Sequence, residues 1–206
     1  MRPPTSSCRT RGPILRRDRT HPLARPVTAP GEPEGGTVLR DAVESDAREI
    51  ARVHVASWRA AYPGLVPDHV LAGLSVDRRA EGWERILADG RQGVVVAASG
   101  EGVVGFGHVG PARDRDLGPT TGQLTTLYLD PDWWGAGVGR ALHDASLDRL
   151  AASGYDRAVL WMLSTNARAR RFYGRQGWSR DGRMRIQQFG GTVVIDHRLA
   201  RRIGPP

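Results

Sequence analysis

The stretch Leu127–Leu142 reads LYLDPDWWGAGVGRAL. Its apolar opening predicts a strand, Asp-Pro marks a turn, and the residues from Val138 onwards predict a helix. Glycines stand at positions 135, 137 and 139, although a glycine inside a helix costs about 1 kcal/mol relative to alanine. Their concentration indicates that the backbone must approach something closely. A strand, a glycine-rich turn and a helix N-terminus together predict an anion site.

The glycine turn favours phosphate as the anion. Backbone N–H groups from Gly135 to Arg140 would point at phosphate oxygens, and the Arg140 side chain would add positive charge. The dinucleotide pattern G-x-G-x-x-G is not met because the third glycine comes one residue early, and the Lys-Ser/Thr of the Walker loop is missing. NAD and ATP are therefore not expected. The alternative is a purely structural role, a tight turn with close helix–sheet packing.

Apolar β-branched runs and helical patterns surround this turn. The runs at 94–98 and 103–109, separated by Ser-Gly-Glu-Gly, predict a β-hairpin, and the pattern over 67–88 fits one helix or two. The other predicted strands are 37–40, 123–129, 158–163, 178–186 and 191–199, and the other predicted helices are 46–62, 138–153 and 167–176. This order predicts a mixed sheet with helices on its faces.

The ends of the chain differ in composition from its middle. Residues 1–35 hold seven prolines and no sustained apolar period, which predicts a disordered Pro/Arg-rich tail. We expect one folded domain over 36–200 and a short C-terminal tail over 201–206. No apolar run reaches the length of a membrane span. The single cysteine, Cys8, excludes an internal disulfide and a multi-cysteine metal site, so we expect a cytoplasmic protein without a metal.

The net charge of +8 does not single out nucleic acid as a partner. All thirty basic residues are arginine, and residues 1–35 hold seven of them against three acidic residues, a surplus of four out of eight. Half of the excess charge therefore lies in the predicted tail. Basic character alone supports only non-specific attraction to nucleic acid, so we do not expect a nucleic-acid partner.

A second motif, NARARRFYGRQGW at 166–178, accompanies the glycine turn. Together the two motifs resemble the GNAT superfamily of acyl-CoA-dependent N-acetyltransferases, whose signatures are Arg/Gln-x-x-Gly-x-Gly/Ala after an apolar strand and Asn-x-x-Ala-x-x-Phe-Tyr followed by Gly-Phe. The similarity extends over 37–199. The matching positions of the second motif are Asn166, Ala169, Phe172, Tyr173, Gly177 and Trp178. The resemblance implies an α/β fold of the α+β type, with a mixed, mostly antiparallel sheet of six to seven strands flanked by about four helices.

The resemblance also implies acetyl-CoA as the acyl donor. Its pyrophosphate would lie on the glycine turn, and its pantetheine arm would bond to Asn166 and to backbone N–H groups near Leu127 and Leu129 if the sheet splays there. Asn166 is equally suited to capping the helix that follows. The cofactor-binding residues implied are Leu127, Tyr128, Leu129, Trp134, Gly135, Ala136, Gly137, Val138, Gly139, Arg140, Asn166, Ala169 and Phe172.

The implied reaction is direct transfer of the acetyl group to a primary amine in a ternary complex. The resemblance makes Tyr173 the acid that protonates the departing thiolate, since a phenol with a pKa near 10 suits that role. The alternative for Tyr173 is an aromatic on the buried face of its helix. No cysteine lies within the predicted domain, which removes a thiol acyl-enzyme intermediate.

Several positions depart from the family pattern. Trp134 stands where the family has Arg or Gln, and Gln123 stands where many relatives have a glutamate base. His54 and His108 could act as the base, or each could be an ordinary hydrogen-bonded histidine. The residues implied for acceptor binding are Trp58, Tyr62, His108 and Gln123, with helix packing as the alternative for the two aromatics.

Two other functions stay open. Gln123 motivates an acyl-CoA-binding regulatory module without catalysis, and the basic charge motivates an acceptor such as a protein N-terminus or aminoacyl-tRNA. Otherwise the expected acceptor is a small-molecule or peptide amine, bound by a monomer or homodimer.

Overall fold

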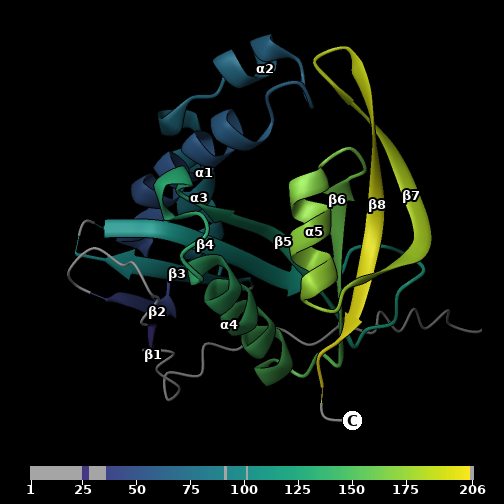
Figure 1. The fold of residues 1–206 in the computed structure, drawn as a ribbon. Helices are drawn as coiled ribbons and strands as arrows, with labels where there is room; N and C mark the ends of the chain where they lie inside the picture. The colour runs from purple at the N-terminus through teal and green to yellow at the C-terminus, as the bar shows by residue number, and fades with distance from the viewer. Residues whose placement is uncertain (1–24, 28–35, 91, 101, 205–206) are drawn as a thin grey trace, which may run out of the picture.

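The chain folds around an eight-stranded sheet with helices on both faces (Figure 1). The computed structural model describes residues 25–27, 36–90, 92–100 and 102–204. The strands follow one another across the sheet in the order β1-β2-β3-β4-β5-β6-β8-β7. Their bounds are Arg25–Val27 (β1), Thr37–Asp41 (β2), Gly93–Ser99 (β3), Gly102–Pro111 (β4), Thr121–Leu129 (β5), Arg157–Leu163 (β6), Ser179–Phe189 (β7) and Thr192–Arg202 (β8).

The pairing confirms the predicted mixed, mostly antiparallel sheet. Neighbouring strands are antiparallel except β5 and β6, which are parallel. The predicted hairpin at 94–98 and 103–109 corresponds to β3 and β4. The helix that follows the glycine turn provides the crossover that a parallel pair requires. Without the three-residue β1, the sheet has seven strands, within the six to seven expected.

Helices pack on both faces of the sheet. Their bounds are Ala47–Ala61 (α1), Asp68–Ala72 (α2), Val76–Asp89 (α3), Val138–Ala152 (α4) and Ala167–Arg175 (α5). Val94 and Val96 of β3 pack in the cluster that includes α1 and α3. Val95 and Ala97 point to the opposite face and pack in the cluster that includes α4. Because both faces are covered, β3 is apolar throughout.

The helical pattern over 67–88 forms two helices. α2 ends at Ala72 and is followed by Gly73, the residue at its C-terminal cap. Ser75 then begins α3, and its hydroxyl oxygen accepts a hydrogen bond from the Arg78 backbone N–H at 3.3 Å. This break gives the described chain five α-helices, where about four were expected.

Both predicted tails contain residues that belong to the fold. β1 lies within the segment 1–35 that we expected to be disordered, yet it pairs antiparallel with β2. Pairing at a sheet edge uses main-chain hydrogen bonds and needs no apolar periodicity, so composition could not reveal it. The rest of that segment lies outside the described residues. At the other end, β8 runs to Arg202 and Ile203 packs against the core, beyond the predicted boundary at 200.

Gly107 of β4 allows α4 to lie close to the sheet. A Cβ atom at Gly107 would clash with the Ser146 hydroxyl oxygen and lie 3.3 Å from Ser146 Cβ. Ser146 has no exposed surface, and its hydroxyl donates to the Leu142 carbonyl oxygen at 2.7 Å. The helix that starts at the glycine turn is therefore held against the sheet by close contact.

The variant Gly107→Ala is expected to lower the free energy of unfolding by about 1–3 kcal/mol, the usual cost of overpacking. Adding Ser146→Ala removes the clashing hydroxyl and should recover part of the loss. Gly82→Ala in α3 is the control, because a Cβ there meets no atom within 4 Å. Urea denaturation measures each variant, and an unchanged midpoint for Gly107→Ala would contradict the close approach.

Candidate active site

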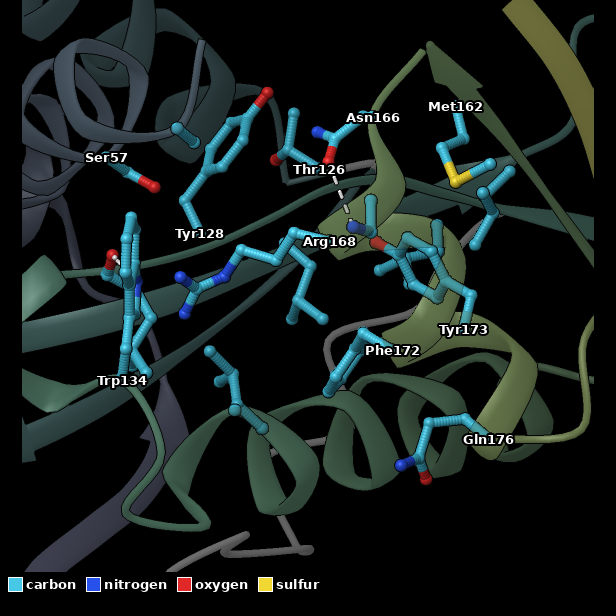
Figure 2. A pocket seen from close by; sticks show the side chains of 18 of the residues that line it. Ser57, Thr126, Tyr128, Trp134, Met162, Asn166, Arg168, Phe172, Tyr173 and Gln176 are labelled. Carbon is cyan, nitrogen blue, oxygen red and sulfur yellow. Dashed lines mark hydrogen bonds between the residues drawn. The ribbon is translucent and has the colours of Figure 1, made fainter. Parts of the chain in front are cut away.

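A cavity lies where β5 and β6 diverge. The two strands pair only as far as Gln123 opposite Val159, although β5 continues to Leu129 and β6 to Leu163. The cavity has a volume of about 580 Å³ and is lined by both strands, the end of α1, the glycine turn and α5 (Figure 2). The sheet therefore splays where pantetheine binding was expected to require it.

Most of the predicted cofactor residues line this cavity. They are Leu127, Tyr128, Leu129, Trp134, Gly135, Gly137, Gly139, Arg140, Asn166, Ala169 and Phe172, together with Tyr173 and Tyr62 from the other predicted groups. Ala136 and Val138 are not among the lining residues. Val138 is fully buried, and both pack in the core cluster that includes α4.

The three glycines of the turn have two different roles. Gly135 and Gly137 adopt φ values of 91° and 85°, which a residue with a side chain rarely adopts, and Gly137 is the N-cap of α4. Gly139 lies inside the helix, where a Cβ would meet only ordinary contacts with Leu129 and Phe172, and its missing side chain leaves space in the cavity.

The free backbone donors stop one residue earlier than expected. The N–H of Arg140 donates to the Gly137 carbonyl oxygen at 3.0 Å, and that of Ala141 donates to the same oxygen at 3.2 Å. The N–H groups of Gly135–Gly139 have no such partner among the described residues. The prediction that Arg140 contributes a free N–H is wrong, because the first turn of α4 already uses it.

The cavity carries positive charge. Arg140, Arg168 and Arg175 line it, and none of its described lining residues is an aspartate or glutamate. The pKa of Arg168 is lowered by burial and by the neighbouring Arg171 guanidinium. These cations and the N-terminus of a 15-residue helix both favour an anionic ligand.

Trp134 occupies a defined position at the cavity wall. Its indole N–H donates to the Leu129 carbonyl oxygen at 3.1 Å, at the end of β5. The Arg168 guanidinium carbon lies 3.5 Å from the centroid of the Trp134 ring. Figure 2 shows the Arg168 side chain, which comes from α5, reaching the ring of Trp134, which comes from the glycine turn. Trp134, the side chain that departs from the family pattern, therefore lies at the cavity wall in contact with Arg168.

Asn166 and Tyr173 come from opposite ends of α5. Asn166 is the N-cap, and its side-chain oxygen accepts the Ala169 backbone N–H at 2.9 Å, which confirms the predicted cap. Tyr173 lies nearly two turns further on, and Figure 2 shows its ring pointing into the cavity. Burial, and then the nearby Tyr62, raise the pKa of Tyr173 well above its usual value. Its phenol is therefore neutral at physiological pH.

Three tyrosines meet in the cavity. Tyr62 follows α1, Tyr128 lies on β5 and Tyr173 on α5. Burial raises the pKa of Tyr62, while hydrogen bonds with Tyr128 and Asn166 oppose that effect and the charge of Asp196 adds to it. Burial likewise raises the pKa of Tyr128, with Tyr62 and Tyr173 among the neighbouring groups. The site thus offers several neutral hydroxyl groups and no ionised one.

Three predicted acceptor residues are not among those that line the cavity. Trp58 packs behind it, with its ring centroid 4.8 Å from that of Tyr62. His108 lies on the face covered by α3, with its ring centroid 5.5 Å from that of Trp83. Gln123 is the last residue of β5 paired with β6, so it lies where the strands are still joined.

His54 and His108 are buried with unsatisfied nitrogens. His54 Nδ1 and His108 Nε2 have no hydrogen-bond partner among the described residues. Burial, and then Arg79, lower the pKa of His54 to about 3. Burial, and then Arg113, lower the pKa of His108 to about 4. Both rings are therefore neutral at pH 7.

Sequence reasoning missed several lining residues. Arg168 is the most consequential, and its signal lay in the helix period, since Arg168 and Phe172 are one turn apart on α5. On β6 the cavity residues follow from strand divergence, which has no sequence signal. The other missed lining residues include Ser57, Thr126, Trp161, Met162 and Gln176.

The chain was compared with known proteins. Residues 46–178 match the model of the Acetyltransferase (GNAT) family. An uncharacterized N-acetyltransferase of Mycobacterium tuberculosis is 30% identical over 160 residues, which cover 77% of this chain and 99% of the relative. The uncharacterized N-acetyltransferase YuaI of Bacillus subtilis is 32% identical over 129 residues, 62% of this chain and 72% of the relative.

A solved structure shares the fold. The PaiA N-acetyltransferase from Thermoplasma acidophilum in complex with coenzyme A matches with a TM-score of 0.63 at 16% identity, covering 81% of this chain and 98% of that one. The mixed sheet is thus an architecture that acetyltransferases use. The chain belongs to the GNAT family of acetyltransferases. Within the part of the chain that the structure describes, no helix has the length and apolar character to cross a membrane.

The buried histidines predict a pH-dependent stability. The pKa of His108 is about 4 in the folded protein and about 6.5 in an unfolded chain. Between these values the unfolded chain binds more protons, so the free energy of unfolding falls as the pH drops from 6.5 to 4. For His108 alone the loss at pH 4 is about 3 kcal/mol.

Urea denaturation between pH 7 and pH 4 measures this effect. The His108→Phe variant should lose less stability over the range than the unsubstituted protein, whatever its stability at pH 7. His69→Gln, at an exposed histidine of α2, is the control and should run parallel to the unsubstituted protein. Parallel curves for His108→Phe would show that His108 is not held neutral by the fold.

Proposed function

We propose that this protein moves an acetyl group from acetyl-CoA to a primary amine by direct attack in a ternary complex. The observation that carries the proposal is Tyr173, a neutral phenol that lines the same cavity as the glycine turn. Membership of the GNAT family and the coenzyme A bound to a protein of the same fold support it.

The positive charge of the cavity and its free backbone N–H groups suit coenzyme A. The N–H groups of Gly135–Gly139 and the first turn of α4 would receive the pyrophosphate. The part of β5 that no longer pairs with β6 would bond to the pantetheine arm, as a peptide bonds to a strand edge. Asn166 lines the same channel. When bound, acetyl-CoA supplies an activated acetyl group on a thiol leaving group.

Tyr173 would hold the proton that the departing sulfur needs. Its raised pKa keeps the phenol protonated until the thiolate develops, and its ring is fixed by Phe172 and Trp178 at centroid distances of 5.2 and 6.0 Å. The amine would enter beside α1, where Tyr62 lines the cavity. None of the described residues that line the cavity is a cysteine, which is consistent with direct attack by the amine.

Proton removal from the amine would not depend on an ionised side chain. The described lining residues include neither a carboxylate nor a histidine, so the amine would bind already neutral or lose its proton to water. Gln123 does not line the cavity, and its lack of a carboxylate is therefore a poor argument for lost catalysis. The site favours an enzyme over a non-catalytic acyl-CoA-binding module.

The acceptor class is tested by measuring thiol release from acetyl-CoA with a panel of amino acids, peptides, polyamines and aminoglycosides. We expect at least one small-molecule or peptide amine to release thiol and to appear as its N-acetyl derivative by mass spectrometry. Acetyl-CoA should also raise the melting temperature, because it binds only the folded protein. The absence of both effects would refute the proposal.

Replacing Tyr173 by phenylalanine should lower turnover by about 10²–10⁴-fold, the usual contribution of a positioned acid. The dissociation constant for coenzyme A should change little, since the ring that packs on Phe172 is kept. The control is Tyr155→Phe, at another buried tyrosine of the same core cluster that does not line the cavity. Unchanged turnover in Tyr173→Phe would remove Tyr173 from the mechanism.

The pH dependence of kcat/KM should follow the acceptor itself. Below the pKa of the amine the rate should rise about tenfold per pH unit, and no descending limb should appear below about pH 10, because the pKa of Tyr173 is raised. Changing to an acceptor with a less basic amine should move the inflection to lower pH by the difference between the two amine pKa values. An inflection that stays fixed for all acceptors would instead reveal a base on the protein.

A further inference from the structure

Position 134 leaves a question about the pyrophosphate. The family resemblance places Arg or Gln there, and this chain has Trp134. The backbone of the glycine turn is unaffected by that difference, but a side-chain partner for the phosphate oxygens is missing at this position. Another residue must supply it, or the contact is lost.

Arg168 lies where such a partner is needed. It lines the cavity from the first turn of α5, two residues after the N-cap Asn166. Phe172, one turn further along the same helix, lies 4.0 Å from the point where a Gly139 Cβ would stand. The face of α5 that bears Arg168 and Phe172 is therefore turned toward the first residues of α4, where the free N–H groups lie.

Trp134 determines the orientation of the Arg168 guanidinium. The Trp134 indole is itself fixed, because its N–H donates to the Leu129 carbonyl oxygen at 3.1 Å. The guanidinium carbon of Arg168 lies 3.5 Å from the ring centroid, well within the range of a cation–π contact. In Figure 2 the Arg168 side chain extends from α5 across the cavity to reach this ring. The contact with Trp134 thus favours one orientation of a side chain that is otherwise flexible.

The contact with the Trp134 ring leaves hydrogen-bonding capacity on the Arg168 guanidinium. The group carries five N–H donors in a planar fork, and one ring face cannot accept all of them. The ion pairs of the described residues do not include Arg168. Its positive charge is therefore not neutralised by a protein carboxylate, and its donors are available to a ligand.

We propose that Arg168, held on the face of Trp134, binds the pyrophosphate of coenzyme A and takes over the contact that the family places at position 134. Trp134 is then a positioning residue, which acts through Arg168. This inference rests on the proposed function, since it presumes that the cavity binds coenzyme A. It adds to that function the identity of the side chain that recognises the phosphate.

The first test measures the dissociation constants of coenzyme A and dephospho-coenzyme A by calorimetry. Dephospho-coenzyme A keeps the pyrophosphate and lacks the 3′-phosphate. Arg168→Met should weaken both by a similar factor of about 10- to 100-fold, the range for charge-assisted hydrogen bonds to phosphate. Arg170→Met is the matched control, an exposed arginine of the same helix that does not line the cavity, and it should bind both normally.

The salt dependence of coenzyme A binding provides a second readout, which would not change if Arg168 had only a structural role. Binding to the unsubstituted protein should weaken as salt is raised, and Arg168→Met should show a flatter dependence because one screened charge pair is gone. Arg168→Gln, which keeps hydrogen-bond donors without the charge, should flatten the salt dependence similarly and lose less affinity. Circular dichroism verifies that both variants are folded.

The positioning role of Trp134 is tested by a double-mutant cycle. Trp134→Leu should weaken coenzyme A binding by about 3- to 10-fold, because Arg168 keeps its charge but loses its fixed orientation. In the Arg168→Met background the same substitution should have little further effect, since the group that it positions is absent. Trp134→Phe keeps an aromatic face and should recover most of the affinity lost in Trp134→Leu.

Each other outcome contradicts a different part of the inference. A loss confined to coenzyme A would assign Arg168 to the 3′-phosphate, and normal binding by Arg168→Met would remove it from ligand recognition. Additive effects of the two substitutions would show that Trp134 does not act through Arg168. If the unsubstituted protein binds neither coenzyme A nor dephospho-coenzyme A, the proposed function fails as well. If it binds both and Arg168→Met binds them equally well, only the inference about Arg168 fails.

Discussion

The site depends on one constraint, that β5 and β6 stop pairing after Gln123 and Val159. Backbone N–H and C=O groups that leave a sheet need new partners. One of them, the Leu129 carbonyl, is taken by the Trp134 indole. The remaining strand edge borders the cavity, and α4 begins at Val138, after the glycine turn that follows β5. A gap between strands, a strand edge and a helix N-terminus thus arise from the same local separation, and each of them favours a polar, extended ligand.

The charges around the cavity are distributed unevenly. Arginines line it, while three carboxylates elsewhere in the described chain have arginine partners that do not line it: Asp116 and Asp181 bind the buried Arg198, and Asp196 binds Arg185. These acidic groups, on β7, on β8 and in the loop between β4 and β5, therefore neutralise arginines that do not line the cavity. The positive charge of the cavity thus follows from its lining residues, which include arginines and no carboxylate among the described ones.

The sequence was sufficient to predict what is local. The closely spaced glycines predicted the turn, Asn166 predicted the start of a helix, and the β-branched runs predicted strands that are buried on both faces. It could not predict which side chains meet across the cavity. Arg168 contacts Trp134 over 34 residues of sequence, and the predicted role of Gln123 depended on where strand pairing ends. Such contacts are set by tertiary packing and have no periodicity of their own.

The strands at the two margins of the sheet have a bearing on self-association. β1 is three residues long and has Pro26 at its centre, which has no N–H to offer a further strand. At the opposite margin β7 has 11 residues, but its register with β8 shifts between Arg180 and Met184, and arginines recur along it. Irregular pairing with β8 makes β7 a poor template for another chain. Among the described strands, both margins of the sheet thus carry features that disfavour pairing with a strand of a second molecule.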